Sequence, residues 1–157
     1  MKMKSYPHRC PNCCGQTLFP VIEDTTVERL HDRQLYTVTV MNLEVLRCTA
    51  CSDGTISYDA IGRIEDALRV AAGILMPADI LAARLRLGAT PGDLAPLFGV
   101  SEGEYTRWES GGQLQSAASD KLLRLYFANP ESFRHNVAWP HVPAAAPQTN
   151  TVRYLDL

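Results

Sequence analysis

Two pairs of cysteines constrain the fold of this chain more than any other feature of its sequence. Cys10 and Cys13 form one Cys-x-x-Cys pair, and Cys48 and Cys51 form the other. Each pair can present two thiolates from one tight turn, and two such turns complete a tetrahedral four-sulfur site of the kind that binds structural zinc. Four thiolate ligands leave no position open for a catalytic water. We therefore predict one structural Zn²⁺ per chain, held by these four cysteines.

Cys14 directly follows the first pair and leaves one alternative open. The spacing accepted for zinc ligands also admits Cys10 with Cys14, although the two-residue spacing of the second pair favours Cys13. A redox dithiol is the other interpretation of a Cys-x-x-Cys pair. Such a dithiol usually lies alone at the start of a helix in a βαβ unit, and neither pair has that context.

The 34 residues between the two pairs predict a small β-sheet. Residues 34–42 alternate β-branched and aromatic side chains between two faces, which is typical of a strand. Shorter strands are expected at 18–22 and 43–47, with a loop or ragged strand in the polar stretch 23–33. A sheet of this size buries too little apolar area to be stable alone, so bound metal would supply folding free energy on the order of 10 kcal/mol.

Helical periodicity begins at residue 59 and continues through most of the remaining chain. Helices are expected at 59–72, 77–87 and 117–129, and a glycine or a proline follows the end of each. Arg69 is expected to face away from the core. The predicted core faces consist of Ile61, Ile64, Leu68 and Ala71 in the first helix, Ile80, Leu81 and Leu85 in the second, and Leu122, Leu125 and Tyr126 in the third.

The stretch TPGDLAPLFGVSEGEYTRWESG contains two further, shorter helical patterns. Thr90 can cap the first, with Asp93 three residues later, and Gly99 ends it. Ser101 can cap the second, with Glu104 as its capping-box partner. Two short helices across a glycine-containing turn are the local pattern of a helix-turn-helix.

The residues of this stretch resemble a known family. Arg84, the run DLAPLFGVS, the segment YTRWE and Gly111 are similar to the helix-turn-helix of the Xre and phage-repressor family. Behind a CxxC…CxxC module, they resemble the MqsA-type antitoxins and related regulators with a YgiT-type zinc finger. The resemblance covers about residues 8–135.

The domain organisation follows from the motifs together with this resemblance. We expect an α+β chain in which a small zinc-bound β module is followed by an all-α helix-turn-helix domain of the Xre and phage-repressor type. The expected segments are the zinc-binding β module at 1–58, a connecting helix at 59–75, the helix-turn-helix domain at 76–137 and a flexible C-terminal tail at 138–157.

The resemblance also implies roles for individual residues. Arg84 and Glu109 would form a structural ion pair. The helix at 101–110 would lie in the major groove of DNA, where Arg107 suits a guanine or a phosphate. Thr90 and Ser101, at the two helix starts, would contact phosphate. The DNA-binding set implied in this way consists of Thr90, Ser101, Gly103, Glu104, Thr106 and Arg107.

Charge limits how strongly such a domain can hold DNA. The chain has a formal net charge of -2, and residues 77–135 contain six basic against seven acidic residues. Non-specific attraction to phosphate should therefore be weak, so tight binding requires a homodimer on a palindromic operator. The alternative is a zinc-stabilised protein-interaction adaptor whose helix-turn-helix has lost strong DNA binding.

The expected function is transcriptional regulation through double-stranded DNA. By resemblance, the chain would be the antitoxin of a type II toxin–antitoxin pair that autoregulates its operon, with a cognate toxin bound by the N-terminal module. An enzyme is not expected, because no catalytic constellation emerges from the sequence. No apolar run approaches the length of a membrane span, and no signal peptide is recognised, so the expected location is the cytoplasm.

Overall fold

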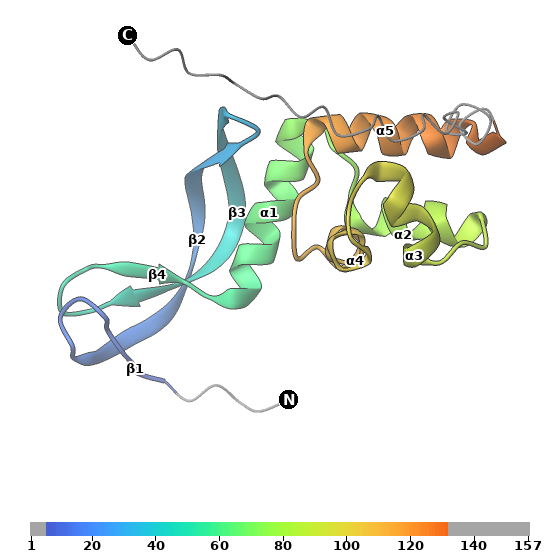
Figure 1. The fold of residues 1–157 in the computed structure, drawn as a ribbon. Coiled ribbons are helices and arrows are strands. Elements are labelled where there is room, and N and C mark those ends of the chain that lie inside the picture. The colour runs from blue at the N-terminus through green and yellow to red at the C-terminus, as the bar shows by residue number, and fades with distance from the viewer. Residues whose placement is uncertain (1–5, 132–157) are drawn as a thin grey trace, which may run out of the picture.

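The structure, a computed structural model, describes residues 6–131 of the chain, and the predicted tail at 138–157 lies outside them. An antiparallel four-stranded sheet in the order β1-β2-β3-β4 comes first, and helices follow (Figure 1). The chain is therefore α+β. The strands are β1 (His8–Arg9), β2 (Gln16–His31), β3 (Gln34–Cys48) and β4 (Gly54–Ile56). The helices are α1 (Tyr58–Ala72), α2 (Pro77–Arg86), α3 (Pro91–Leu94), the 3-10 helix η1 (Ala95–Phe98), α4 (Glu102–Ser110) and α5 (Ala117–Ala128).

β2 and β3 form one long hairpin, so of the two expectations for 23–33, a loop or a ragged strand, the strand is correct for most of that stretch. Residues 23–31 continue β2 to a two-residue turn at Asp32 and Arg33. Both turn residues have positive φ, 48° and 65°, as a type I′ turn requires. Cross-strand contacts help to hold this polar strand against β3. One example is the hydrogen bond between the hydroxyls of Thr26 and Thr39, which lie 2.9 Å apart.

A bulge interrupts the hairpin near its middle, and α1 binds the chain there. The register shifts between Glu23 and Thr25, opposite a stretch where Asn42 takes a φ of 51°. Arg63 of α1 donates to the carbonyls of Met41 and Asn42, both over 2.7 Å. The irregular backbone thus has hydrogen-bond partners on the helix that covers it.

α1 lies against β3 and shares its core, so this helix packs on the sheet as well as connecting to the later helices (Figure 1). The buried positions of α1 differ partly from the predicted face. Ile64 and Leu68 are buried, but Ile61 is 38% exposed and Ala71 is also exposed. Arg69, expected to face away from the core, is buried. The shared core consists of Val38, Val40, Leu43, Val45, Ala60 and Ile64.

The helices after α1 enclose a second, larger core rich in aromatic rings. Several leucines predicted to lie in it are on the surface instead, with Leu85 61% and Leu125 64% exposed and Leu81 and Leu122 also exposed. α5 buries Leu123 and Tyr126. Tyr126 belongs to the predicted face, whereas Leu123 takes the buried position that was predicted for Leu122. The buried cluster consists of Ile80, Leu94, Ala95, Phe98, Tyr105, Trp108, Leu123 and Tyr126.

Polar side chains fix the link between α1 and α2 against α5. Asp120 accepts a hydrogen bond from the Leu75 amide over 2.7 Å, and Gln115 donates to the Leu75 carbonyl over 2.8 Å. Arg124 bonds both Asp120 and the Gly73 carbonyl, at 2.6 and 3.0 Å. These contacts give hydrogen-bond partners to the Leu75 amide and to the carbonyls of Gly73 and Leu75.

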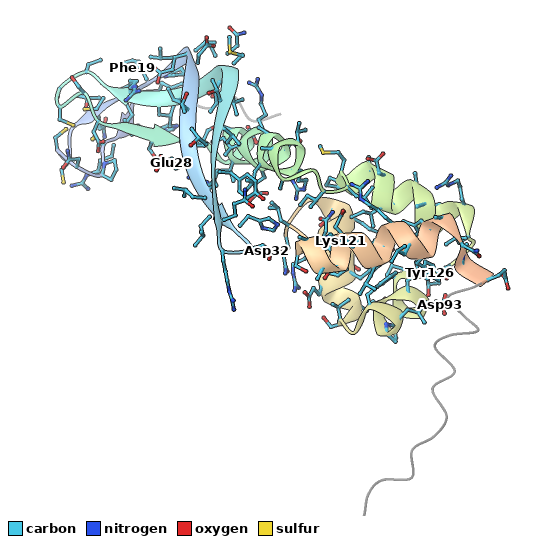
Figure 2. All side chains as sticks on the ribbon, turned by 90° about the horizontal axis from the view of Figure 1, so that it is seen from above. Phe19, Glu28, Asp32, Asp93, Lys121 and Tyr126 are labelled. Atoms are coloured by element: carbon cyan, nitrogen blue, oxygen red, sulfur yellow. The ribbon has the colours of Figure 1, made fainter. Side chains whose placement is uncertain are left out.

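The hairpin also touches the helical half of the molecule directly. Asp32, at the turn of the hairpin, accepts a hydrogen bond from the Ala117 amide at the start of α5. Figure 2 shows Asp32 beside the helices and Phe19 toward the opposite end of the sheet. α1 is joined to the helical half separately, because Nη2 of its Arg69 donates to the Gly111 carbonyl at the end of α4 over 3.0 Å.

Candidate metal centre and nucleic-acid interface

Four cysteine sulfurs meet at the end of the sheet formed by β1, β4 and the adjoining parts of β2 and β3. The ligand atoms of Cys10, Cys13, Cys48 and Cys51 all lie within 4.8 Å of one another. Two of the sulfur pairs, Cys10 with Cys51 and Cys13 with Cys48, are 3.6 Å apart. A Zn–S bond of about 2.3 Å in a tetrahedron places sulfurs roughly 3.8 Å apart. The predicted four-cysteine cluster is therefore present and its spacing fits a bound metal ion.

The two cysteine turns have the same backbone pattern, and this explains Cys14. The Cys14 amide donates to the Cys10 carbonyl over 2.9 Å, and the Ser52 amide donates to the Cys48 carbonyl over 3.1 Å. Both donors take positive φ, 61° for Cys14 and 58° for Ser52. Cys14 thus occupies the turn position that Ser52 fills in the second knuckle, outside the four-sulfur cluster, and Cys13 is the ligand candidate.

Hydrogen bonds make the Cys48 thiol more acidic than an ordinary cysteine. The Thr17 hydroxyl lies 2.9 Å from its sulfur, and the Ala50 and Cys51 amides donate to the same sulfur over 3.3 and 3.4 Å. With the Thr17 contact as the largest cause, these donors lower the pKa of Cys48 to about 6. Cys48 is therefore prepared to act as a thiolate ligand near neutral pH.

The pKa of Cys51 moves in the opposite direction. A backbone hydrogen bond from Asp53 lowers it, but the neighbouring thiols, chiefly Cys48, together with burial raise it to about 12. Four sulfurs at this spacing cannot all be negative without a cation between them. A bound divalent metal would supply that positive charge and hold all four as thiolates.

The second candidate site is the surface of α4, which is firmly attached to the helical core. Ser101 caps the helix by accepting a hydrogen bond from the Glu104 amide over 3.1 Å. Tyr105 and Trp108 anchor its inner face, with exposures of 0% and 1%. α4 therefore presents its remaining side chains from a rigid support.

Arg84 and Glu109, which the resemblance pairs, are joined by a two-pronged ion pair. Nε and Nη2 of Arg84 donate to the two carboxylate oxygens of Glu109 over 2.6 and 3.0 Å. The third nitrogen donates to the Ala89 carbonyl over 2.9 Å. Both side chains are largely enclosed, and the hydrogen bonds that Arg84 donates to Glu109 raise the pKa of Arg84. The pair joins α2 to α4.

The outer face of α4 contains three of the residues predicted to bind DNA. Gly103, Thr106 and Arg107 are exposed on it, and Glu104 is half-buried beside them. The Thr106 hydroxyl donates to the Glu102 carbonyl of its own helix over 2.8 Å, so its methyl group and accepting lone pairs remain available. Arg107 is the one basic residue of α4.

The hydroxyls of Thr90 and Ser101, which were predicted to contact phosphate, each accept a hydrogen bond from an amide of the helix that they cap. The Thr90 hydroxyl donates to Asp93 over 2.6 Å and accepts from its amide over 3.2 Å. Asp93 and Glu102 are exposed near this surface, and Glu102 Oε2 would lie 3.3 Å from a Cβ added at Gly92. The candidate interface therefore combines one arginine with several carboxylates.

Reasoning from the sequence missed three residues that shape these sites: Thr17, Arg69 and Gln113. Thr17 supplies the closest donor to Cys48, and its place four residues after Cys13 was a usable signal. Gln113 bonds Arg107, with Oε1 2.9 Å from Nε. The contact from Arg69 to Gly111 joins residues 42 positions apart, so no local pattern indicates it.

No protein-family model and no curated protein matches this chain. Among the described residues, no helix is both long enough and apolar enough to cross a membrane.

Proposed function

We propose that this chain is a zinc-stabilised, sequence-specific DNA-binding regulator that reads double-stranded DNA with α4. The observation that carries the proposal is the division of α4 into two faces. Tyr105 and Trp108 are buried, whereas Gly103, Thr106 and Arg107 are exposed on one side of a capped helix. A short helix that follows another across a tight turn and projects small and basic side chains suits the major groove.

Zinc is the metal we propose for the four-sulfur site, with one ion per chain. Four thiolates in a tetrahedral arrangement favour Zn²⁺ over the cations that prefer oxygen ligands. Because all four sites are sulfur, the ion would be structural. It would hold the two knuckles together and thereby fix the open end of the β2–β3 hairpin.

The biological setting that we propose is that of an antitoxin. The motifs resemble those of the MqsA-type antitoxins, so we infer a homodimer that binds a palindromic operator in its own promoter region and a cognate toxin bound by the N-terminal module. Dimerisation is required on physical grounds as well. One arginine on each recognition helix, surrounded by carboxylates, gives little phosphate attraction per protomer.

Binding to the chain's own upstream DNA tests the proposal. Fluorescence anisotropy with a labelled duplex from that region, at stated salt, should give saturable binding that scrambled duplexes do not reproduce. Arg107→Ala should weaken the specific binding by at least about tenfold, the loss expected for one base-reading arginine. Arg29→Ala, on the exposed surface of β2, is the matched control and should bind like the wild type.

A protein-interaction adaptor is the second candidate, and the exposed carboxylates favour it. Asp93 and Glu102 flank the exposed face of α4. Their negative charges repel the phosphates of DNA but are complementary to a basic protein surface. The anisotropy experiment separates the two functions. A folded, zinc-loaded protein that binds no duplex from its upstream region, at low or physiological salt, would exclude the DNA reader in favour of the adaptor.

A further inference from the structure

Gln113 lies against Arg107 although it is outside α4 and outside the predicted DNA-binding set. Arg107 Nε donates to Gln113 Oε1 over 2.9 Å, and the Gln113 amide donates to the Arg107 carbonyl over 3.2 Å. Gly111 makes this return possible, because its φ of 78° turns the chain back at the end of the helix. Gln113 is therefore joined to Arg107 by its side chain and by its main chain.

This contact fixes how the Arg107 side chain is presented. A guanidinium is planar and its donors form a rigid fork, so holding Nε restricts the orientation of the whole group. Arginine can only donate, and Gln113 must therefore turn its oxygen toward Arg107. Among residues 6–131, neither Nη1 nor Nη2 of Arg107 has a hydrogen-bond acceptor. Two parallel donors thus remain for a partner.

Gly103 keeps the surface beside these donors open. A Cβ added at residue 103 would lie 3.7 Å from Arg107 Nη1. That distance is an ordinary contact, so any longer side chain at this position, one turn earlier on α4, would lie beside the fork. The absence of a side chain leaves Nη1 accessible to a flat ligand.

We propose that Gln113 is a specificity-determining positioning residue, which holds Arg107 so that Nη1 and Nη2 bind O6 and N7 of one guanine in the major groove. These two guanine acceptors match the spacing of the arginine fork. Holding the long side chain before binding reduces the rotamer entropy lost on the DNA. The inference rests on the proposed DNA-binding function and adds the base and the residue that select it.

The test is a base-substitution profile measured with the full-length, zinc-loaded protein. Anisotropy competition with duplexes that carry every single base-pair change should locate the position where Arg107→Ala removes discrimination. Gln113→Met is close in shape but has neither the acceptor nor the donor. It should lower the preference for guanine at that same position by roughly tenfold. Gln34→Met, at an exposed position on β3, is the matched control and should leave the profile unchanged.

A second variant separates positioning from general attraction to DNA. Gln113→Glu keeps an acceptor for Arg107 Nε, so the guanine preference should survive while the added charge weakens binding to every duplex. Thermal unfolding of each variant checks that the fold is retained. The inference is overturned if Gln113→Met keeps the full guanine preference, if it weakens all duplexes equally, or if Gln113→Glu loses the preference. Absence of wild-type binding to any duplex would overturn the proposed function and this inference together, whereas the variants can overturn the inference alone.

Discussion

The two ends of the molecule are stabilised by different means. At the cysteine end of the sheet, the buried cluster consists of Cys10, Leu18 and Cys48, so two of its three members are candidate metal ligands. Under α4, eight buried residues form a cluster that contains several aromatic side chains. The helical half can therefore be stable through burial alone, whereas the cysteine end would depend on a metal ion bound by its sulfurs.

The hairpin between these ends has a support on each side. α1 covers β3 on both sides of the bulge, where Val38, Val40, Leu43 and Val45 are buried, and Arg63 binds the bulge. Beyond the bulge the side chains of Phe19 and Ile22 are 42% and 60% exposed. The cluster around the cysteines has three buried residues, against six in the core shared with α1, so a bound metal would supply stability that apolar burial does not supply there.

Metal removal should have the largest effect and should separate the two ends. We expect the purified chain to contain one zinc. A chelator, or Cys48→Ser, should unfold the cysteine end, because structural zinc in small modules supplies on the order of 10 kcal/mol. Amide hydrogen exchange should show this loss in β1, β4 and the adjoining ends of β2 and β3, with slow exchange retained in the helices around Trp108.

Cys14→Ser is the matched control for that experiment. Cys14 is one residue from Cys13 but belongs to the turn rather than to the sulfur cluster. The variant should therefore bind one zinc as the wild type does. Loss of metal from Cys14→Ser, or a wild-type protein without metal, would contradict the assignment of the four ligands.

Breaking an ion pair should also have different effects in the two halves. Glu109→Ala leaves Arg84 as an enclosed, unpaired cation and should lower the free energy of unfolding by about 3 kcal/mol. Glu23→Ala breaks the pair of Glu23 with Arg47 on the sheet, where both side chains are partly exposed, and should lower it by at most about 1 kcal/mol. Urea denaturation compares the two variants, and equal losses would show that the ion pair in the helical half is no better enclosed than the surface pair.

The features of the fold and of the two sites that could be predicted from the sequence are those that depend on residues close together in the chain. The four ligands and the caps at Thr90 and Ser101 follow from residue types at short, fixed spacings, and the structure places these residues accordingly. The stretch 23–31 could be predicted only as a loop or a ragged strand, because its side chains are mostly polar. It is held mainly by backbone pairing with β3 and by contacts such as the pair of Thr26 and Thr39.

The misplaced core residues have a related cause. Helical periodicity identifies an apolar face, but Leu85 and Leu125 lie where no neighbouring element covers that face. Arg69 shows the converse, because a charged residue on a helix is expected in solvent. Its burial depends on Asp66 and on the distant Gly111 carbonyl, which accept its hydrogen bonds over 3.1 and 3.0 Å.

The smallest predicted effect concerns pH and two of the helix caps of the helical half, Thr90 and Ser101. The Thr90 side chain and amide both donate to Asp93 and lower the pKa of that carboxyl. A lowered folded-state pKa means that the capping box stabilises the fold above the ordinary pKa of aspartate, near 4. The contribution is lost as the pH falls through the lower folded-state value. The Ser101 cap uses no carboxylate and should not depend on pH in this range.

Variants at the two caps test this difference. Ser101→Ala should lower the free energy of unfolding by about 1 kcal/mol at pH 7 and at pH 3 alike. Asp93→Asn should destabilise the protein at pH 7, and its difference from the wild type should shrink at pH 3. Urea denaturation followed by the fluorescence of buried Trp108 measures both, and comparison with the wild type at each pH removes the effect of acid on the cysteine end. A pH-independent loss in Asp93→Asn would mean that the cap acts through its shape and hydrogen bonds rather than through the charge of the carboxylate.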